Sequence, residues 1–153
     1  LIPAGFAALD QLRIEAGLIL VGNEFDGQQD PFEAGIGFAV PLKSKEEDFI
    51  GKSVLKERKA NPQKKLVGLE LIGKEPSGHG DCVHVGRSQV GVITSGCLST
   101  TLNKNIALCR IDNQYSEIGT EVEVGKIDGH QKRISAKVVA FPHFDPKKTR
   151  VRS

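Results

Sequence analysis

The second half of the chain alternates short apolar stretches with turns rich in Gly, Pro, Asn and Asp. Six stretches have the length and composition of β-strands. They read "KLVGLELIG", "CVHVG", "QVGVITSG", "NIALCRI", "TEVEVGKI" and "RISAKVVAF". Strand candidates of this length, separated by turn residues, predict a small antiparallel barrel or sandwich.

The residues before Pro62 follow a different pattern. Apolar residues of segment 6–16 recur at helical spacing, and Gly17 can end a helix there. A helix is therefore predicted over residues 6–16. The apolar run 18–21 that follows predicts a short strand.

Three further elements are predicted between that strand and Pro62. Asp30 is a candidate N-cap, with Pro31 at the first helical position and Glu33 three residues after the cap, which predicts a short helix. The apolar run 36–40 predicts a buried strand. Residues 48–61 predict a further helix that ends before Pro62.

The change of pattern predicts a domain boundary near residues 60–65. We expect an α+β piece over residues 1–62 and an all-β domain over residues 63–146. Residues 147–153 are rich in Lys and Arg and are interpreted as a solvated basic tail.

Composition and charge narrow the class of protein. A chain of 153 residues that is 39% hydrophobic and 26% charged is typical of a globular protein. No apolar stretch approaches the roughly 20 residues of a membrane span, and the first residues lack a signal-peptide pattern. We therefore expect a soluble, cytoplasmic protein that does not bind a membrane. The net charge of +2 gives no reason to expect nucleic acid as a partner.

The numbers of methionine and cysteine residues also bear on the class of protein. The sequence has no methionine and starts at Leu1, which indicates a fragment or a trimmed chain. The three cysteines, at positions 82, 97 and 109, form no C-x-x-C pair and are interpreted as reduced, packed thiols.

A metal site is one candidate chemistry. His79, Asp81, Cys82 and His84 lie within six residues and are all possible ligands. Zinc signatures usually need a second, separated ligand cluster, and the chain has none. We favour a turn that leads into a strand, and we predict no metal site.

A nucleophile is a second candidate. The stretch "VGVITSGCLSTTL" places Ser95, Cys97 and Ser99 close together. It has no G-x-S-x-G elbow, and nothing marks a histidine as the base that an activated nucleophile needs. The four histidines are His79, His84, His130 and His143. The hydroxyls are better explained by backbone hydrogen bonds where a strand turns.

Charged residues also gather where the first helix meets the strand predicted after it. Arg13 and Glu15 lie near the end of that helix, and Glu24 and Asp26 follow the strand. Element ends are common places for binding sites. Spacing alone nevertheless favours ordinary solvated charges.

Taken together, several motifs resemble the aminomethyltransferase family, to which the T-protein of the glycine cleavage system belongs. The matching stretches are "LDQLRIEAGLILVGNEFD", "DPFEAGIGFAV", "DFIGKSVL", "KLVGLELIG", "VGVITSGCLSTTLNKNIAL", "GTEVEV" and "VVAFPHFDP". They follow the family order over nearly the whole chain. The resemblance implies the end of an α/β folate-binding domain followed by a small antiparallel Greek-key β-barrel.

The resemblance also implies a function and its limits. It implies tetrahydrofolate as cofactor, with Arg13, Glu15, Glu24 and Phe38 as rim or supporting residues of the folate site. The catalytic aspartate of the family lies in an N-terminal portion that this sequence lacks, so no catalytic residue is expected here. Ser95 and Cys97 would then be structural, and the missing N-terminal portion would be a partner.

Two departures from the family bear on the donor. The glycine-cleavage enzymes commonly have an arginine where this chain has Leu9, and often a tyrosine where it has Val21. An aromatic residue is kept at Phe38. We therefore expect a tetrahydrofolate-dependent aminomethyl- or methyltransferase-like protein that demethylates a small methylated donor. A non-catalytic folate-binding or assembly module, or the folate arm of a larger dehydrogenase, remains the alternative.

Overall fold

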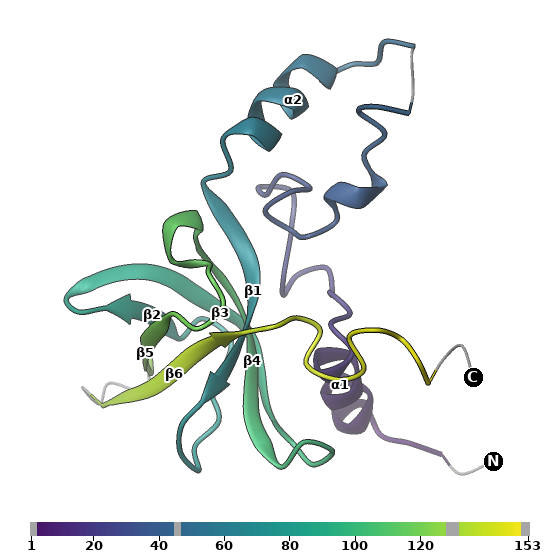
Figure 1. The fold of residues 1–153 in the computed structure, drawn as a ribbon. Helices are drawn as coiled ribbons and strands as arrows, with labels where there is room; N and C mark the ends of the chain where they lie inside the picture. Colours follow the sequence, from purple (N-terminus) through teal and green to yellow (C-terminus); the bar gives the residue numbers. More distant parts are fainter. Residues whose placement is uncertain (1–2, 45–46, 128–131, 151–153) are drawn as a thin grey trace.

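Residues 3–44, 47–127 and 132–150 are described by a computed structural model of the chain. In these residues six strands form a closed barrel, in the order β1-β4-β3-β2-β5-β6 (Figure 1). The strands are β1 (Lys64–Leu71), β2 (Cys82–Val85), β3 (Ser88–Ser99), β4 (Lys104–Asp112), β5 (Glu121–Gly125) and β6 (Arg133–Val139). Short 3₁₀ turns occur at η1 (Gly37–Ala39) and η2 (Asn113–Tyr115), and the helices are α1 (Phe6–Glu15) and α2 (Lys52–Ala60).

The barrel has Greek-key topology. Every strand pair is antiparallel, and β1 pairs with both β4 and β6, which closes the sheet. Strands β2, β3 and β4 follow one another as neighbours, while β1 lies beside β4 instead of β2. This confirms the predicted α+β class with a small antiparallel Greek-key barrel.

Apolar residues fill the barrel and also cover part of its outside. The interior contains residues at alternate positions, such as Leu69 on β1 and Cys109 on β4. A second cluster on the outer face joins Leu66, Leu108 and Ile14 of α1. Strands β1 and β4 are therefore buried on both faces, which explains why their sequences are almost continuously apolar.

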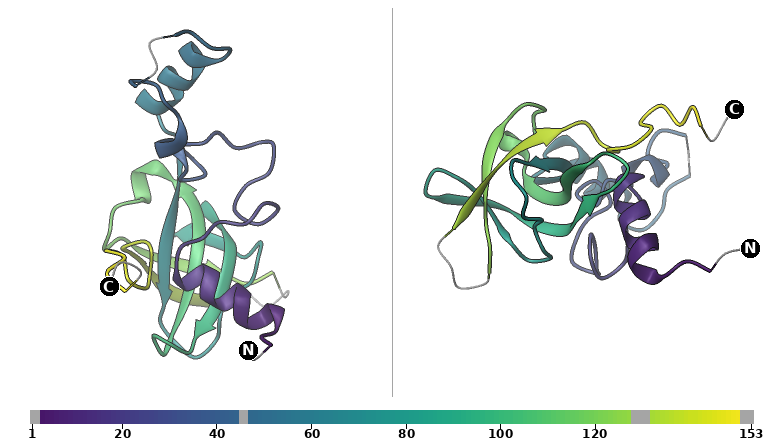
Figure 2. Two further views of the ribbon diagram at one scale, coloured as in Figure 1. Left: turned by 90° about the vertical axis from the view of Figure 1, so that its right-hand side faces the viewer. Right: turned by 90° about the horizontal axis from the view of Figure 1, so that it is seen from below.

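The two helices lie in different surroundings. Helix α1 packs on the outer face of the barrel against β3 and β4, as the two views of Figure 2 show. Helix α2 projects from the start of β1, away from α1 (Figure 1), and none of its described residues is buried. The helices predicted over residues 6–16 and 48–61 are confirmed as α1 and α2, and α2 ends before Pro62 as expected.

Three short elements predicted in the first part differ from the structure. Residues 18–20 have no regular structure, and Val21 takes part only in an isolated bridge, with Phe25, instead of a strand. Residues 36–40 contain the 3₁₀ turn η1 instead of a strand. Both runs are apolar, but among the described residues no neighbouring strand pairs with them, so their backbone groups bond locally.

The helix predicted at Asp30 is reduced to a turn. The carboxylate of Asp30 accepts bonds from the backbone N–H groups of Phe32 and Glu33, at 2.8 and 2.9 Å, as an N-cap does. Gly35 then has a φ of +77°, a left-handed conformation that ends the turn. The cap was predicted correctly and the helix was not.

The C-terminal segment fastens the end of α1 to the barrel. The N–H of Phe144 donates to the carbonyl of Glu15, the last residue of α1, at 2.9 Å. Gly17 follows α1 with a φ of +69°, and a Cβ there would lie 2.8 Å from Pro142. Glycine therefore permits both the turn and the close approach. The division into residues 1–62, 63–146 and 147–153 stays a prediction.

A tight contact on β3 gives the first test of the fold. A Cβ at Gly96 would lie 2.5 Å from the carbonyl oxygen of Ser77. We expect Gly96→Ala to lower the free energy of unfolding of the chain by about 1–3 kcal/mol, because backbone must move to relieve the clash. Gly27→Ala is the control, because nothing lies within 4 Å of its Cβ position. Urea denaturation measures both, and equal stabilities would contradict the packing described.

Candidate functional site

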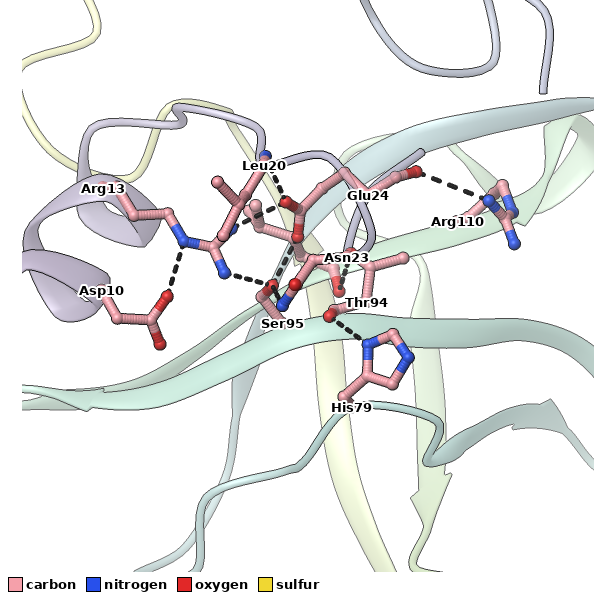
Figure 3. Close-up of polar contacts among 10 residues, drawn as sticks. Asp10, Arg13, Leu20, Asn23, Glu24, His79, Thr94, Ser95 and Arg110 are labelled. Atoms are coloured by element: carbon pink, nitrogen blue, oxygen red, sulfur yellow. Dashed lines mark hydrogen bonds and ion pairs between the residues drawn. The ribbon is translucent and has the colours of Figure 1, made fainter. Parts of the chain in front are cut away.

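A buried polar network joins α1, the loop after it and β3 (Figure 3). Arg13 lies in the last turn of α1 and is 8% exposed, and Glu24 follows in the loop with no exposed surface. Ser95 belongs to β3 and is also buried. Segments that are distant in sequence thus place a cation, an anion and a hydroxyl in one water-excluded cluster.

The guanidinium of Arg13 has three partners. Its Nη1 lies 2.7 Å from Oε2 of Glu24, and its Nη2 donates to Oγ of Ser95 at 2.7 Å. Its Nε donates to the half-exposed carboxylate of Asp10, one turn earlier in α1, at 2.8 Å. The arginine is therefore held in one orientation by two carboxylates and a hydroxyl.

The carboxylate of Glu24 uses both of its oxygens. Oε2 also accepts from the backbone N–H of Leu20 at 2.8 Å, and Oε1 accepts from the hydroxyl of Ser95. The same hydroxyl accepts from the side-chain amide of Asn23 at 3.2 Å. The charge of Glu24 is thus neutralised by Arg13, and its oxygens are already bonded. This carboxylate is suited to holding structure and not to proton transfer.

Glu15, the last residue of α1, belongs to a second polar cluster, which involves Ser99 at the end of β3. Its Oε1 accepts from Ser99 at 2.6 Å and from the amide of Gln11 at 3.0 Å. Burial acts to raise the pKa of Glu15, but the hydrogen bonds from Ser99, Gln11 and Thr101 together lower it below its ordinary value. Glu15 is therefore held as a buried, charged anchor between α1 and the barrel.

Phe38 lies apart from both clusters. It belongs to η1 and is 89% exposed. Of the four predicted site residues, the structure brings Arg13 and Glu24 into direct contact, places Glu15 near the same helix end, and leaves Phe38 on the surface. Their assignment to a folate site stays a prediction.

The thiol of Cys97 does not have the properties of a nucleophile. Burial, together with the nearby charges of Glu15 and Asp10, raises its pKa to about 11. The thiolate is the reactive form, so this thiol is protonated near neutral pH. Ser95 and Ser99 donate to carboxylates instead of to a histidine. The structural interpretation of this stretch therefore accounts for all three side chains.

Two of the candidate metal ligands, Asp81 and His79, form hydrogen bonds with backbone groups near the turn before β2. The carboxylate of Asp81 accepts from the backbone N–H groups of Gly78 and Ile127, at 2.8 and 3.1 Å. His79 Nδ1 lies 2.7 Å from the carbonyl of Thr94. Among the residues that the structure describes, no three His, Cys, Asp or Glu side chains are arranged to hold a metal ion. His130 lies outside the described residues.

Sequence reasoning missed the role of Ser95 in the network. Arg13 and Ser95 are 82 positions apart, so no local spacing links them. A usable signal was the run Thr94-Ser95 inside an otherwise apolar strand, because buried polar side chains need partners. In the described part of the chain, no helix is long and apolar enough to cross a membrane.

The structure defines a closed six-stranded barrel, with α1 packed on its outer face through a buried polar network. Residues 64–145 match the family described as "Glycine cleavage T-protein C-terminal barrel domain", and residues 1–44 match "GCVT N-terminal domain". The chain therefore belongs to the glycine cleavage T-protein family. This confirms the resemblance drawn from the sequence.

Individual relatives agree with this assignment. The trimethylamine-oxide aldolase of Ruegeria pomeroyi is 58% identical over 151 residues, which are 99% of this chain and 19% of that protein. The aminomethyltransferase of Bacillus subtilis is 50% identical over 145 residues, 94% of this chain and 39% of that protein. The crystal structure of glycine cleavage system aminomethyltransferase T from Bartonella henselae matches with a TM-score of 0.82 and 28% identity, over 93% of this chain and 39% of that one. The chain thus spans well under half the length of each.

The raised pKa of Cys97 can be tested by alkylation. At pH 8 we expect Cys97 to react with iodoacetamide about a hundredfold more slowly in the folded chain than in urea, because its thiolate is scarce when folded. The folded-state rate should rise steadily as the pH approaches 11. Mass spectrometry of the peptide that contains Cys97 measures this. Equally fast labelling of folded and unfolded chains at pH 8 would contradict it.

The lowered pKa of Glu15 links stability to pH. A carboxyl whose pKa is lower when folded stabilises the fold above its unfolded pKa, and this stabilisation is lost as the pH falls through the folded pKa. We expect Ser99→Ala to lower the free energy of unfolding of the chain by about 1–3 kcal/mol at pH 7. The loss should shrink as the pH falls through the lowered, folded-state pKa of Glu15 and its carboxylate is protonated.

Ser88→Ala is the matched control, because Ser88 lies at the exposed start of the same strand. Its effect on the unfolding free energy should be small over the whole pH range. A loss for Ser99→Ala that stays the same as the pH falls from 7 until Glu15 is protonated would show that the charged form of Glu15 is not the partner.

Proposed function

We propose that this chain is the C-terminal part of a tetrahydrofolate-dependent one-carbon transfer protein that acts on a small methylated donor. The observation that carries the proposal is the 58% identity, over 99% of this chain, to a protein named for trimethylamine oxide, a small methylated compound. In such a reaction a one-carbon unit is transferred to tetrahydrofolate. The catalytic acid–base group of the family would lie outside this chain.

The surface of the first segment supports a site shared with other polypeptide. Phe6, Leu9 and Leu12 are exposed on α1, and Val21 is exposed on the loop that follows. The buried side of α1 faces the barrel through Ile14 and Glu15. An apolar helix face that points away from its own domain is typical of a covered interface or a ligand wall.

The residues of this chain fit one wall of a folate site. A flat, partly apolar cofactor needs apolar and aromatic surface with a few placed polar groups, and the exposed Leu9, Val21 and Phe38 supply surface of this kind. We assign Arg13, Glu15 and Glu24 to supporting this wall from behind, since all three are buried and bonded internally.

Leu9 bears on the donor. An arginine at this position would provide a fixed positive charge and paired hydrogen bonds for an anionic group, and leucine provides neither. Leu9 is 60% exposed, so its side chain is free to contact a partner or ligand. This favours a small donor gripped by the pocket over an aminomethyl group delivered on a lipoyl carrier protein.

Transfer of an aminomethyl group is the second candidate function. It is favoured by the 50% identity to the Bacillus subtilis protein named aminomethyltransferase. A non-catalytic folate-binding or assembly module is the third, since no catalytic group is assigned within this chain.

Substrate assays of the full-length protein distinguish these functions. With tetrahydrofolate present, we expect turnover of trimethylamine oxide to dimethylamine, methylenetetrahydrofolate and water, in which cleavage of the N–O bond supplies the two-electron oxidation of the methyl group. We expect little turnover of aminomethylated lipoyl carrier protein. Formation of methylenetetrahydrofolate is the readout. Turnover of the carrier alone would support the second function, and tetrahydrofolate binding without any turnover would support the third.

Two arginine variants sharpen this test. Leu9→Arg should lower kcat/KM for the small donor about tenfold or more, a change that corresponds to roughly 1.4 kcal/mol. Val54→Arg is the matched control, because Val54 is exposed to a similar extent on the other helix, α2, which lies away from α1 (Figure 1). Equal effects of the two variants would show that Leu9 has no specific role in turnover of the small donor.

A further inference from the structure

A β-bulge turns Ser95 toward the first segment. Ile93 pairs with Cys109 and Ser95 pairs with the next residue, Leu108, so Thr94 is an extra residue in β3. Without this bulge, Ser95 would point the same way as Ile93, into the barrel. With it, Ser95 shares the outer face with Leu108, which packs on α1. The strand therefore presents a hydroxyl to the outside of the barrel.

Ser95 uses its full bonding capacity there. A hydroxyl has one donor and two acceptor positions. Ser95 donates to Glu24 and accepts from Arg13 and Asn23, and all three partners belong to the first segment. Its side chain is thus a direct polar tie from the barrel to residues 13–24.

Glu24 links Ser95 to the loop 20–24 through its hydrogen bonds with Leu20. Its carboxylate accepts from the N–H of Leu20, and its own N–H donates to the carbonyl of Leu20 at 3.0 Å. The loop is therefore closed on itself through the same side chain that Ser95 holds. The exposed side chains of Leu20 and Val21 are presented by this closed loop.

We propose that Ser95 is a positioning residue: through Glu24 and Arg13, the barrel fixes the loop 20–24 and with it the rim of the acceptor site. The loop conformation is the direct claim, and its importance for tetrahydrofolate rests on the proposed function. Ser95 would not touch the reacting atoms. Its loss should change binding of the acceptor much more than the chemical step.

Ser99 provides a matched control. It lies on the same strand, is equally buried, and donates to a buried carboxylate of the first segment, that of Glu15. Its hydroxyl donates to Glu15 and accepts from the N–H of Leu102, and both partners lie outside the loop 20–24. Ser99→Ala should therefore cost stability as Ser95→Ala does, without loosening the loop.

The experiment uses the full-length protein with Ser95→Ala, Ser95→Thr and Ser99→Ala. Hydrogen–deuterium exchange of the peptide that covers residues 18–26 reports on the loop, whose amides at Leu20, Gly22 and Glu24 are bonded within it. Steady-state kinetics and tetrahydrofolate binding report on the site. Thermal melting measures the stability of each variant.

We expect Ser95→Ala to speed exchange of the loop by about tenfold and to weaken tetrahydrofolate binding by a similar factor, because two buried charged groups lose a partner. The value of kcat should stay within about threefold, since no group that touches the reaction is lost. Ser99→Ala should leave loop exchange unchanged at a similar melting temperature. Ser95→Thr, which keeps the hydroxyl, should show the wild-type rate of loop exchange and the wild-type affinity for tetrahydrofolate.

Each result decides the proposal. Unchanged loop exchange in Ser95→Ala, or faster exchange with unchanged tetrahydrofolate affinity, overturns it. Equal loosening by Ser99→Ala also overturns it, because the effect would then be a general loss of stability. If the wild-type protein does not bind tetrahydrofolate, the proposed function fails, and the positioning of the loop is decided by exchange alone.

Discussion

The ion pair between Arg13 and Glu24 is the interaction on which the joining of the two parts of this chain depends. Two charges removed from water are tolerated only when they face each other and their other polar atoms are bonded. Here Asp10, the N–H of Leu20 and the hydroxyl of Ser95 complete the set. Such a pair adds little net stability, but removing one partner typically costs about 3–5 kcal/mol. It therefore selects one docked arrangement of helix, loop and strand.

This requirement also explains why α1 is turned as it is. A surface helix usually buries its apolar side. Helix α1 instead buries Arg13, Ile14 and Glu15 and exposes Phe6 and Leu9. The carboxylates of Glu15 and Glu24 meet hydroxyls that the barrel supplies, so polar contacts decide which side faces inward. The apolar side of α1 is therefore left exposed.

The sequence predicted the elements better than their contacts. All six strands were recognisable because turn residues separate short apolar runs, and both helices end at a glycine or before a proline. The runs 18–21 and 36–40 have the same local character as the strands, yet in the part of the chain that the structure describes no strand lies beside them to pair with. The contact of Arg13 with Ser95 depends on how the barrel and α1 dock, which no local spacing encodes. Buried polar positions inside an apolar strand were the one local hint.

The bulge at Thr94 makes one strand serve two purposes. On one side of it, Ile93 fills the barrel interior, and on the other, Ser95 holds the loop 20–24 from outside. A loop held only by its own short-range bonds opens easily, because such bonds contribute little beyond local structure. A group on a packed strand is held far more rigidly than one on a loop. The barrel therefore holds the loop 20–24 through a side chain on a packed strand, while Ile93 of the same strand fills the barrel interior.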